Sequence, residues 1–518
     1  MTTRNPSRRQ ALRIAGGSAV ATAAVAGGAT PAAAKVSYRP GRYPATAVLD
    51  VQARHLVNRF SYGITPELAA EVRAAGGHLA WFDQQLAAAV AAPADDLGDW
   101  WPDLHLDALT LWQRNVSGAR GGGQVMWDYG RRSLVRRLSS PPQVFEVVAE
   151  FWENHLHVPT GADSVFTHRV AYGDLIRTHA LGRFEDLLHA TITSPAMLIF
   201  LNGASSTKVH PNENLGRELL ELHTVGVGNF TEQDVKDAAR ILTGWRVDMY
   251  KSWDPYYSSR DHATGPVQVL GFTDPNGSAD GREVTLRLLS YLARHPDTAR
   301  RIARKLARTF VCDDPPQSLV DCLAATYLAH DTAIQPVLRA LVRSAEFKGS
   351  VDQLVRDGDE DVLATYRLLG AQVGPPTADV WAANAIYWQV SYLGLAPFSW
   401  PRPDGQPLGR EAWSSPTRVI ASMALHWNMA NAYWPTVDVQ RRAPKAWLPR
   451  SSMPFRDLVD HVSRLVLHRP STATLLKACC EATEMTPAAR VRPDSDLLTW
   501  RWPRLVAAVL DSPAFYQR

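Results

Sequence analysis

Apolar residues recur along most of the chain at the spacing of an amphipathic helix. After the pair Pro141-Pro142, which interrupts the chain, Val144, Val147, Val148 and Phe151 follow at intervals of one to three residues. This pattern gathers apolar side chains on one face of a helix. Alternation of apolar and polar residues over the length of a strand is scarce. We therefore predict an all-α fold, a large irregular multi-helix array with long functional loops and little or no sheet.

Two further segments predict where helices begin and end. Residues 296–311 start with a proline and repeat apolar residues every three or four positions with arginines between them, which predicts an amphipathic helix with a basic outer face. Residues Thr231 to Asp234 form an acidic capping box ahead of another apolar run, and Gly244 marks the expected stop.

Turn-forming residues gather in four segments, which are 35–46, 118–123, 248–281 and 397–416. The third is long for a loop inside a compact body, and such loops are usually functional or act as lids. We predict one largely helical body over residues 35–518, with a possible seam near 370–377.

The charge of the chain is uneven only at its beginning. The 518 residues include 55 Lys and Arg and 51 Asp and Glu. Residues 1–34 contain four arginines and no acid, so the remaining 484 positions hold 51 of each sign. A body without excess positive charge is not expected to bind nucleic acid.

The first 34 residues have the three parts of a secretory signal. Arg8-Arg9 form a twin-arginine motif, residues 14–28 are uncharged and weakly apolar, and Ala32-Ala33-Ala34 fit an Ala-x-Ala cleavage site. We therefore predict that the twin-arginine export machinery is a partner. The mature protein would be periplasmic, cell-wall-associated or extracellular. No later run of about 18 apolar residues appears, so no permanent membrane span is expected.

The four cysteines allow one possible disulfide bridge. Cys479 and Cys480 are neighbours, whereas Cys312 and Cys322 are spaced so that they could pair in an exported protein. Cys322 also fits an apolar helical pattern, in which a free thiol would be part of the core.

Histidine, asparagine and glutamate concentrate in three segments. These are F-W-E-N-H-L-H at 151–157, N-E-N-L-G-R-E-L-L-E-L-H-T-V-G at 212–226, and R-D-H-A-T-G at 260–265. None contains the signatures of a serine-hydrolase elbow, a phosphate-binding P-loop, a dinucleotide fold or an H-E-x-x-H zinc helix.

The order of these motifs resembles the bacterial domain-of-unknown-function 1800 family. The resemblance covers about residues 50–435 and includes T-E-x-D-V-x-x-A-A-R-x-L-T-G-W at 231–245 and H-P-x-T-A-R-x-I-A-x-K-L at 295–306. It implies an exported, largely helical protein and no particular reaction. Glu153 stands where the family's F-W-H-N-H would carry a histidine.

Imidazole and carboxylate groups in these segments suit a metal site. We predict His155, Glu218 and His223 as ligands of a divalent transition metal. In a regular helix His223 falls roughly 140° from Glu218, so both reach one ion only if the helix ends near Leu222. A non-covalent haem is the less favoured cofactor, because residues 222–226 only faintly resemble the proximal-histidine segment of plant-type peroxidases.

The other polar residues receive supporting roles. We predict Glu221, His262 and Arg217 as catalytic, with Asn154 and Asn214 orienting a cofactor or substrate. A structural alternative exists for Arg217, since its spacing to Glu213 and to Glu221 also fits ordinary ion pairs on a helix surface.

Two functions from different classes follow. The favoured one is an exported metal-dependent enzyme, oxidative or hydrolytic, with a small-molecule or glycan substrate. The alternative is a secreted, non-catalytic helical scaffold or binding protein in which these polar residues form a buried network. The 17 tryptophans allow stacking on a glycan, for which Trp100, Trp101 and Trp253 are expected to be exposed.

Overall fold

The computed structural model describes residues 36–90, 96–377 and 381–518, so the predicted signal peptide lies outside the described residues. Residues from Tyr38 onward form one compact unit. Helices dominate it, which confirms the predicted fold class.

The first half of the chain supplies twelve of the described α-helices. They are α1 (Val51–Arg59), α2 (Pro66–Ala74), α3 (His78–Val90), α4 (Ala108–Val116), α5 (Gly122–Ser139), α6 (Gln143–His155), α7 (Arg169–His179), α8 (Phe184–Ile192), α9 (Pro195–Phe200), α10 (Glu213–Glu218), α11 (Glu232–Ile241) and α12 (Arg282–Ala293). Between them lie 3-10 turns η1 (Asp96–Trp100), η2 (Pro102–His105), η3 (Val165–Thr167) and η4 (Gly203–Ser205), and a π-helical turn, η5 (Leu219–His223).

The second half supplies the remaining described helices. They are α13 (Pro296–Phe310), α14 (Gln317–Ala329), α15 (Ile334–Arg343), α16 (Ala345–Gly349), α17 (Gly358–Leu368), α18 (Ala382–Tyr392), α19 (Arg410–Trp413), α20 (Pro416–Ala430), α21 (Phe455–Val466), α22 (Ala473–Thr483), α23 (Trp502–Leu510) and α24 (Pro513–Tyr516), with 3-10 turns η6 (Pro444–Trp447) and η7 (Asp496–Leu498).

The sequence patterns explain the two helices that carry the site. In α6, Val144, Val148 and Trp152 are fully buried, as their spacing predicts. In α13, Ile302, Leu306 and Phe310 are fully buried in the same way. Burying a large apolar side chain stabilises the fold by about 1.5–3 kcal/mol, so these faces fix both helices firmly in the core.

The predicted capping box starts α11. Thr231 Oγ1 accepts a hydrogen bond from the Asp234 backbone N–H at 3.2 Å, and the Asp234 carboxylate accepts one from the Thr231 backbone N–H at 2.8 Å. Two backbone donors that a helix start leaves free are thereby satisfied.

Strands form only four small antiparallel pairs among the described residues. Two of the pairs involve the long segment 248–281: β1 (Trp245–Val247), directly before it, pairs with β2 (Pro255–Tyr257), and β3 (Val267–Val269) pairs with β4 (Phe272–Asp274). The predicted seam contains β5 (Gln372–Val373), which pairs with β6 (Val439–Gln440). The fourth pair joins β7 (Met453–Pro454) to β8 (Arg490–Val491).

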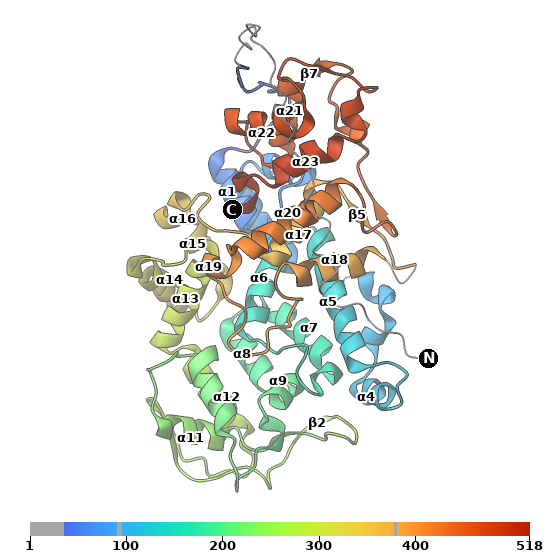
Figure 1. Ribbon diagram of the computed structural model, residues 1–518. Coiled ribbons are helices and arrows are strands. Elements are labelled where there is room, and N and C mark those ends of the chain that lie inside the picture. The colour runs from blue at the N-terminus through green and yellow to red at the C-terminus, as the bar shows by residue number, and fades with distance from the viewer. Residues whose placement is uncertain (1–35, 91–95, 378–380) are drawn as a thin grey trace, which may run out of the picture. The chain divides into compact units, whose positions relative to one another are not determined.

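Helix α6 lies in the middle of the body (Figure 1), with α13 on one side and α5 on the other. The C-terminal helices α21, α22 and α23 lie beside α1, so segments from both ends of the body meet. His468 Nε2 donates to the Ile64 carbonyl at 2.8 Å across this junction.

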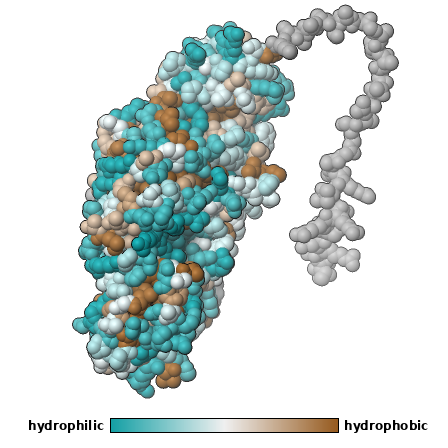
Figure 2. All heavy atoms as spheres, turned by 90° about the vertical axis from the view of Figure 1, so that its left-hand side faces the viewer, coloured by the Kyte–Doolittle hydropathy of each residue, from teal (hydrophilic) through white to brown (hydrophobic). Residues whose placement is uncertain are grey.

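The surface is mainly hydrophilic on the face shown in Figure 2, where apolar residues form separate patches. In the described ranges no helix combines the length and apolarity that crossing a membrane requires. Trp101 and Trp253 are 3% and 0% exposed, so the expectation that they face solvent is wrong; both pack in apolar clusters. Cys312 and Cys322 are free thiols, and the possible bridge between them is not formed.

Candidate functional site

The C-terminal turn of α6 points His155 into the interior. The Lys305 Nζ lies 3.0 Å from His155 Nδ1, and His155 Nε2 lies 3.2 Å from the backbone oxygen of His223. Because a carbonyl only accepts, Nε2 carries the ring proton, and Nδ1 is left to accept from the lysine. Burial and the nearby Lys305 hold the pKa of His155 well below its ordinary value, so the ring is neutral.

His223 is the second buried histidine. Its side chain is fully buried, and its ring centroid lies 6.3 Å from that of His155, at an angle of 88° between the ring planes. Neither of its ring nitrogens has a hydrogen-bond partner in the described part of the chain. Burial, with a contribution from Lys305, lowers the pKa of His223 to about 3. An unsatisfied, neutral imidazole in the interior is an available ligand or hydrogen-bonding group.

A π-helical turn carries His223. Helix α10 ends at Glu218, and η5 continues from Leu219 to His223. Since π turns bond residue i to i+5, the regular-helix angle between Glu218 and His223 no longer applies. The turn is closed by the Thr224 Oγ1, which donates to the Leu219 carbonyl at 2.7 Å. Such turns inside helices are frequent at functional sites.

Lys305 is the residue that the sequence analysis missed. It lies on α13 beside His155, and its side chain is partly exposed. Burial, helped by the positive charge of Arg301, lowers the pKa of Lys305 to about 7, while Asp404 acts in the opposite direction. No carboxylate forms an ion pair with it among the residues described. Its signal was present, because the lysine lies three positions after Ile302 and directly before Leu306, both on the apolar face.

Arg301 lies one turn before Lys305 on the same helix. Its Nε donates to the Leu222 carbonyl at 3.0 Å, at the end of the π turn. Gly226 has a φ of 93°, and a Cβ there would lie only 3.0 Å from Arg301 Nη1. Glycine therefore provides the backbone conformation and the space that the guanidinium occupies. Burial lowers the pKa of Arg301, and Glu221 opposes this effect.

The segment 397–408, here called the strap, crosses α6. Asn154 Nδ2 donates to the Gln406 carbonyl at 3.1 Å, and Asn154 Oδ1 accepts from the Gln406 N–H at 2.6 Å. His157 Nε2 donates to the Trp400 carbonyl at 2.7 Å. Gly405, with a φ of 78°, approaches so closely that a Cβ would lie 2.1 Å from the Asn154 carbonyl oxygen. These contacts hold the strap, including Asp404, against α6.

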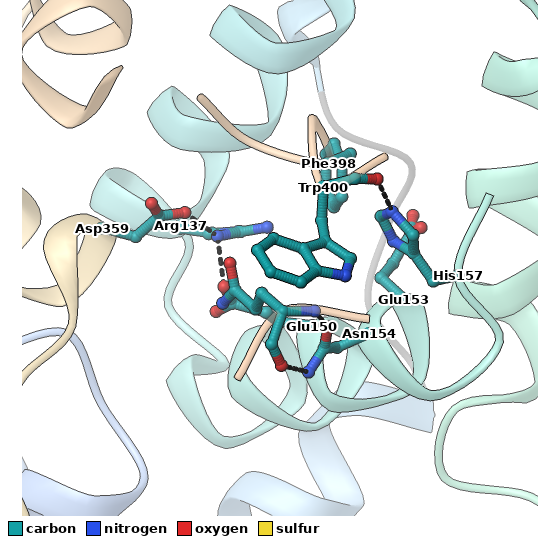
Figure 3. A pocket seen from close by; sticks show the side chains of 9 residues that line it. Arg137, Glu150, Glu153, Asn154, His157, Asp359, Phe398 and Trp400 are labelled. Atoms are coloured by element: carbon teal, nitrogen blue, oxygen red, sulfur yellow. Dashed lines mark hydrogen bonds and ion pairs between the residues drawn. The ribbon is translucent and has the colours of Figure 1, made fainter. Parts of the chain in front are cut away.

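A small pocket, mostly filled by side chains, lies between the strap and α6 (Figure 3). Arg137 Nη1 donates to Glu150 Oε1 at 2.7 Å and to Asp359 Oδ2 at 2.8 Å. Burial raises the pKa of both carboxyl groups, although Arg137 opposes this. The Trp400 ring lies between Arg137 and His157. The charged groups of this pocket are paired with one another, unlike Lys305.

The comparisons with known proteins give a family. A family described as a protein of unknown function, DUF1800, matches residues 55–517. The chain belongs to this family. Neither the curated proteins nor the solved structures contain a match. The match extends beyond the predicted limit near residue 435, so DUF1800 includes the C-terminal helices that pack beside α1.

In this DUF1800 chain the three predicted metal ligands are brought together only in part. His155 and His223 are neighbours, but the Glu218 carboxylate makes no hydrogen bond or ion pair with a described residue. Burial and the charge of Glu221 raise the pKa of Glu218. No group of three His, Cys, Asp or Glu side chains that could hold a metal occurs within the described ranges. Metal binding by His155, Glu218 and His223 stays a prediction.

The other predicted site residues have identifiable surroundings. Arg217 pairs with Glu232, at 2.5 Å, rather than with Glu213 or Glu221. Asn214 is exposed on the first turn of α10. The catalytic roles of Arg217 and Glu221 and the orienting role of Asn214 stay predictions.

His262 lies within its own loop. It is 2% exposed, its Nδ1 lies 3.0 Å from the Thr243 carbonyl, and its Nε2 lies 2.8 Å from Asn276 Oδ1. These contacts fix the hairpin segment around it, and its predicted catalytic role is likewise untested.

Glu153, the residue that departs from the expected F-W-H-N-H motif, points to another network. Its carboxylate accepts from Arg169 Nη2 at 2.6 Å and from the Tyr129 hydroxyl at 2.8 Å. Although burial opposes it, Arg169 holds the pKa of Glu153 below its ordinary value. The substitution therefore supplies the partner of a buried arginine rather than a group facing His155.

Proposed function

We propose that this DUF1800 protein is an exported enzyme whose reaction centre is the pair Lys305 and His155. The observation that carries the proposal is a partly exposed lysine that has no ion-pair partner among the described residues and donates to a neutral, buried histidine. A buried network that serves only structure pairs its charges, since an unpaired charge in the interior is costly.

The chemistry of this pair is proton transfer. With a pKa of about 7, the Lys305 amine exists in both protonation states near neutral pH, which is the condition under which a group both takes up and returns a proton efficiently. His155 is locked by the His223 carbonyl and orients the amine. A small-molecule substrate would reach Lys305 from the solvent side, between the π turn and the strap.

A metal-dependent version of the same centre is the second candidate. It is favoured by the two unpaired ring nitrogens of His223 and the nearness of His155. In this version His155 would exchange its hydrogen bond with Lys305 for the ion, and Glu218 would be the third ligand. Elemental analysis of protein exported through its own signal tests it, with His155→Ala and Glu218→Ala alongside. Stoichiometric metal that both variants lose supports this candidate, and its absence from the native protein rejects it.

The non-catalytic scaffold remains the rival from another class. The paired networks around Arg169 and Arg137 are what a scaffold requires. Lys305 distinguishes the two functions, because a scaffold has no use for a reactive amine.

Competitive acylation of the full chain with trace acetic anhydride, read by peptide mass spectrometry from pH 5 to 11, measures this reactivity. Exposed Lys236 in the same digest is the internal control. We expect the Lys305 rate to rise with a midpoint near 7, about three pH units before an ordinary lysine. If the acylation rate of Lys305 instead rises over the same pH range as that of Lys236, the result would favour the non-catalytic scaffold.

A further inference from the structure

We propose that the substrate of this centre carries an oxyanion, a carboxylate or a phosphate, which binds between Arg301 and Lys305. The inference rests on the proposed function, because it places the substrate beside the reactive lysine.

The two cations form a prepared pair. They are four residues apart on α13 and therefore lie on the same side of this helix. Arg301 is fixed by its bond to the Leu222 carbonyl and by the space at Gly226. Lys305 is fixed by His155. The Arg301 bond engages Nε, so both terminal nitrogens keep donor capacity, and a guanidinium binds oxyanions best through two parallel N–H groups.

Among the described residues, neither cation has a counter-ion. No carboxylate makes an ion pair with Arg301 or Lys305 in the part of the chain that is described. On the same helix, by contrast, Arg300 pairs with Asp297 at 3.1 Å and contacts Asp321 at 3.6 Å. Two like charges, both partly withdrawn from water and one turn apart, repel each other unless an anion lies between them.

Nearby carboxylates do not fill this place. Glu221 acts on Arg301 and Asp404 acts on Lys305 through space, without direct contact. An oxyanion in direct contact with both cations gains more than these separated charges cost, because the interaction falls with distance and with the intervening solvent. Glu221 and Asp404 would repel a second negative charge, so they would favour ligands that carry their charge at one end only.

The anion has a measurable effect on the lysine. A negative charge in contact with the ammonium favours its charged form. Binding of inorganic phosphate or acetate should therefore raise the acylation midpoint of Lys305 by about one pH unit and slow its labelling near neutral pH several-fold.

The test uses the full chain with phosphate, acetate or chloride at constant ionic strength. We expect phosphate, acetate or both to shift the Lys305 midpoint and chloride to leave it unchanged, and the responding anion identifies the class. Arg301→Gln should lose the shift, while Arg300→Gln, which removes one charge from the exposed side of α13, should keep it. If circular dichroism shows that Arg301→Gln is unfolded, Arg301→Lys replaces it. This variant keeps the charge but cannot donate two parallel N–H groups. It should therefore retain less than half of the shift in the Lys305 midpoint.

The outcomes separate the two proposals. A Lys305 midpoint near 10 without added anion overturns the proposed function. A midpoint near 7 that no oxyanion moves, or that moves equally in the Arg301 variant, overturns the anion site alone.

Discussion

The amine of Lys305 donates to the Nδ1 of His155 across 3.0 Å, and this contact joins α13 to the end of α6. The other ring nitrogen of the histidine continues the chain of hydrogen bonds to the His223 carbonyl in the π turn. Three segments that are distant in sequence, all within motifs of the DUF1800 family, thus meet at one lysine.

Replacing His155, which accepts the hydrogen bond of Lys305, should change the pKa of Lys305. In His155→Leu the Lys305 ammonium loses its hydrogen bond, so the pKa of Lys305 should fall further, by roughly one unit. In His155→Asn the amide oxygen takes the place of Nδ1, and the pKa should stay close to that of the wild type. Acylation of Lys305 against pH measures both. Equal midpoints in the two variants would show that the His155 contact does not tune the lysine.

The substitution His155→Leu should also lower the stability of the fold. His155→Leu leaves the His223 carbonyl without its donor, and an unsatisfied buried acceptor costs about 1–3 kcal/mol. Urea unfolding of the three proteins checks this, and a Leu variant as stable as the wild type would contradict the hydrogen bond.

His426 should make the stability of the fold depend on pH. His426 lies between Asp361, at 2.9 Å, and Asp511, at 2.7 Å. Although burial opposes it, Asp361 and Asp511 raise the pKa of His426 to about 9. Because the unfolded value is about 6.5, the stabilisation is complete below pH 6.5 and is lost as the pH rises through 9.

His426→Asn should therefore destabilise the fold most at low pH. We expect a loss of about 3 kcal/mol in the free energy of unfolding at pH 6, since Asp361 loses the charged His426 and keeps Arg418 as its buried cationic partner, and a much smaller loss at pH 10. Urea unfolding of both proteins at pH 6, 8 and 10 gives the difference. A difference that stays constant or grows with pH would refute the charged histidine.

The buried pair of Glu153 and Arg169 should be structural. Glu153→Gln removes the charge that compensates Arg169, whose side chain is fully buried. Leaving an uncompensated buried arginine costs about 3–5 kcal/mol, so the variant should unfold at clearly lower urea concentration. The Lys305 midpoint should not move, because Glu153 faces away from it. A shifted midpoint in a stable variant would assign Glu153 to the reaction centre instead.

The strap should depend on Gly405. A methyl group there collides with the Asn154 carbonyl, and the positive φ adds strain of about 1 kcal/mol or more. Gly405→Ala should release the strap and speed proteolysis within residues 397–408 several-fold. Gly161→Ala is the matched control, since a Cβ at Gly161 meets open space. Equal cleavage of the two variants would mean that the strap is not held by this contact.

Sequence patterns predicted the helices well because each one needs only a local repeat. The apolar spacing of α6 and α13 and the capping box of Thr231 and Asp234 are read directly from neighbouring residues. The buried positions of Trp101 and Trp253 were not predictable in this way. Their environments are formed by distant segments, such as Trp381 beside Trp101 and Trp112 beside Trp253.

The candidate site was predicted only in part, because its residues come from distant segments of the chain. His155 and His223 were recognised by residue type, and the structure places them together. The π turn was not predicted, because the sequence suggested only a regular helix or one that ends near Leu222, and no local pattern indicates a change to i to i+5 hydrogen bonds. Lys305 lies in the predicted basic helix 296–311 but was assigned no role, although its position between Ile302 and Leu306 directs it inward. Its partner on α6 is 150 positions away, and no local pattern connects the two.

The most direct test of the account is the protonation of Lys305 itself. Nitrogen-15 NMR of the lysine side-chain amines in the full chain, with Lys305→Arg to assign the signal, gives its pKa without chemical modification. The account predicts a titration near pH 7, separate from all exposed lysines. A Lys305 signal that titrates near pH 10 with the others would contradict it.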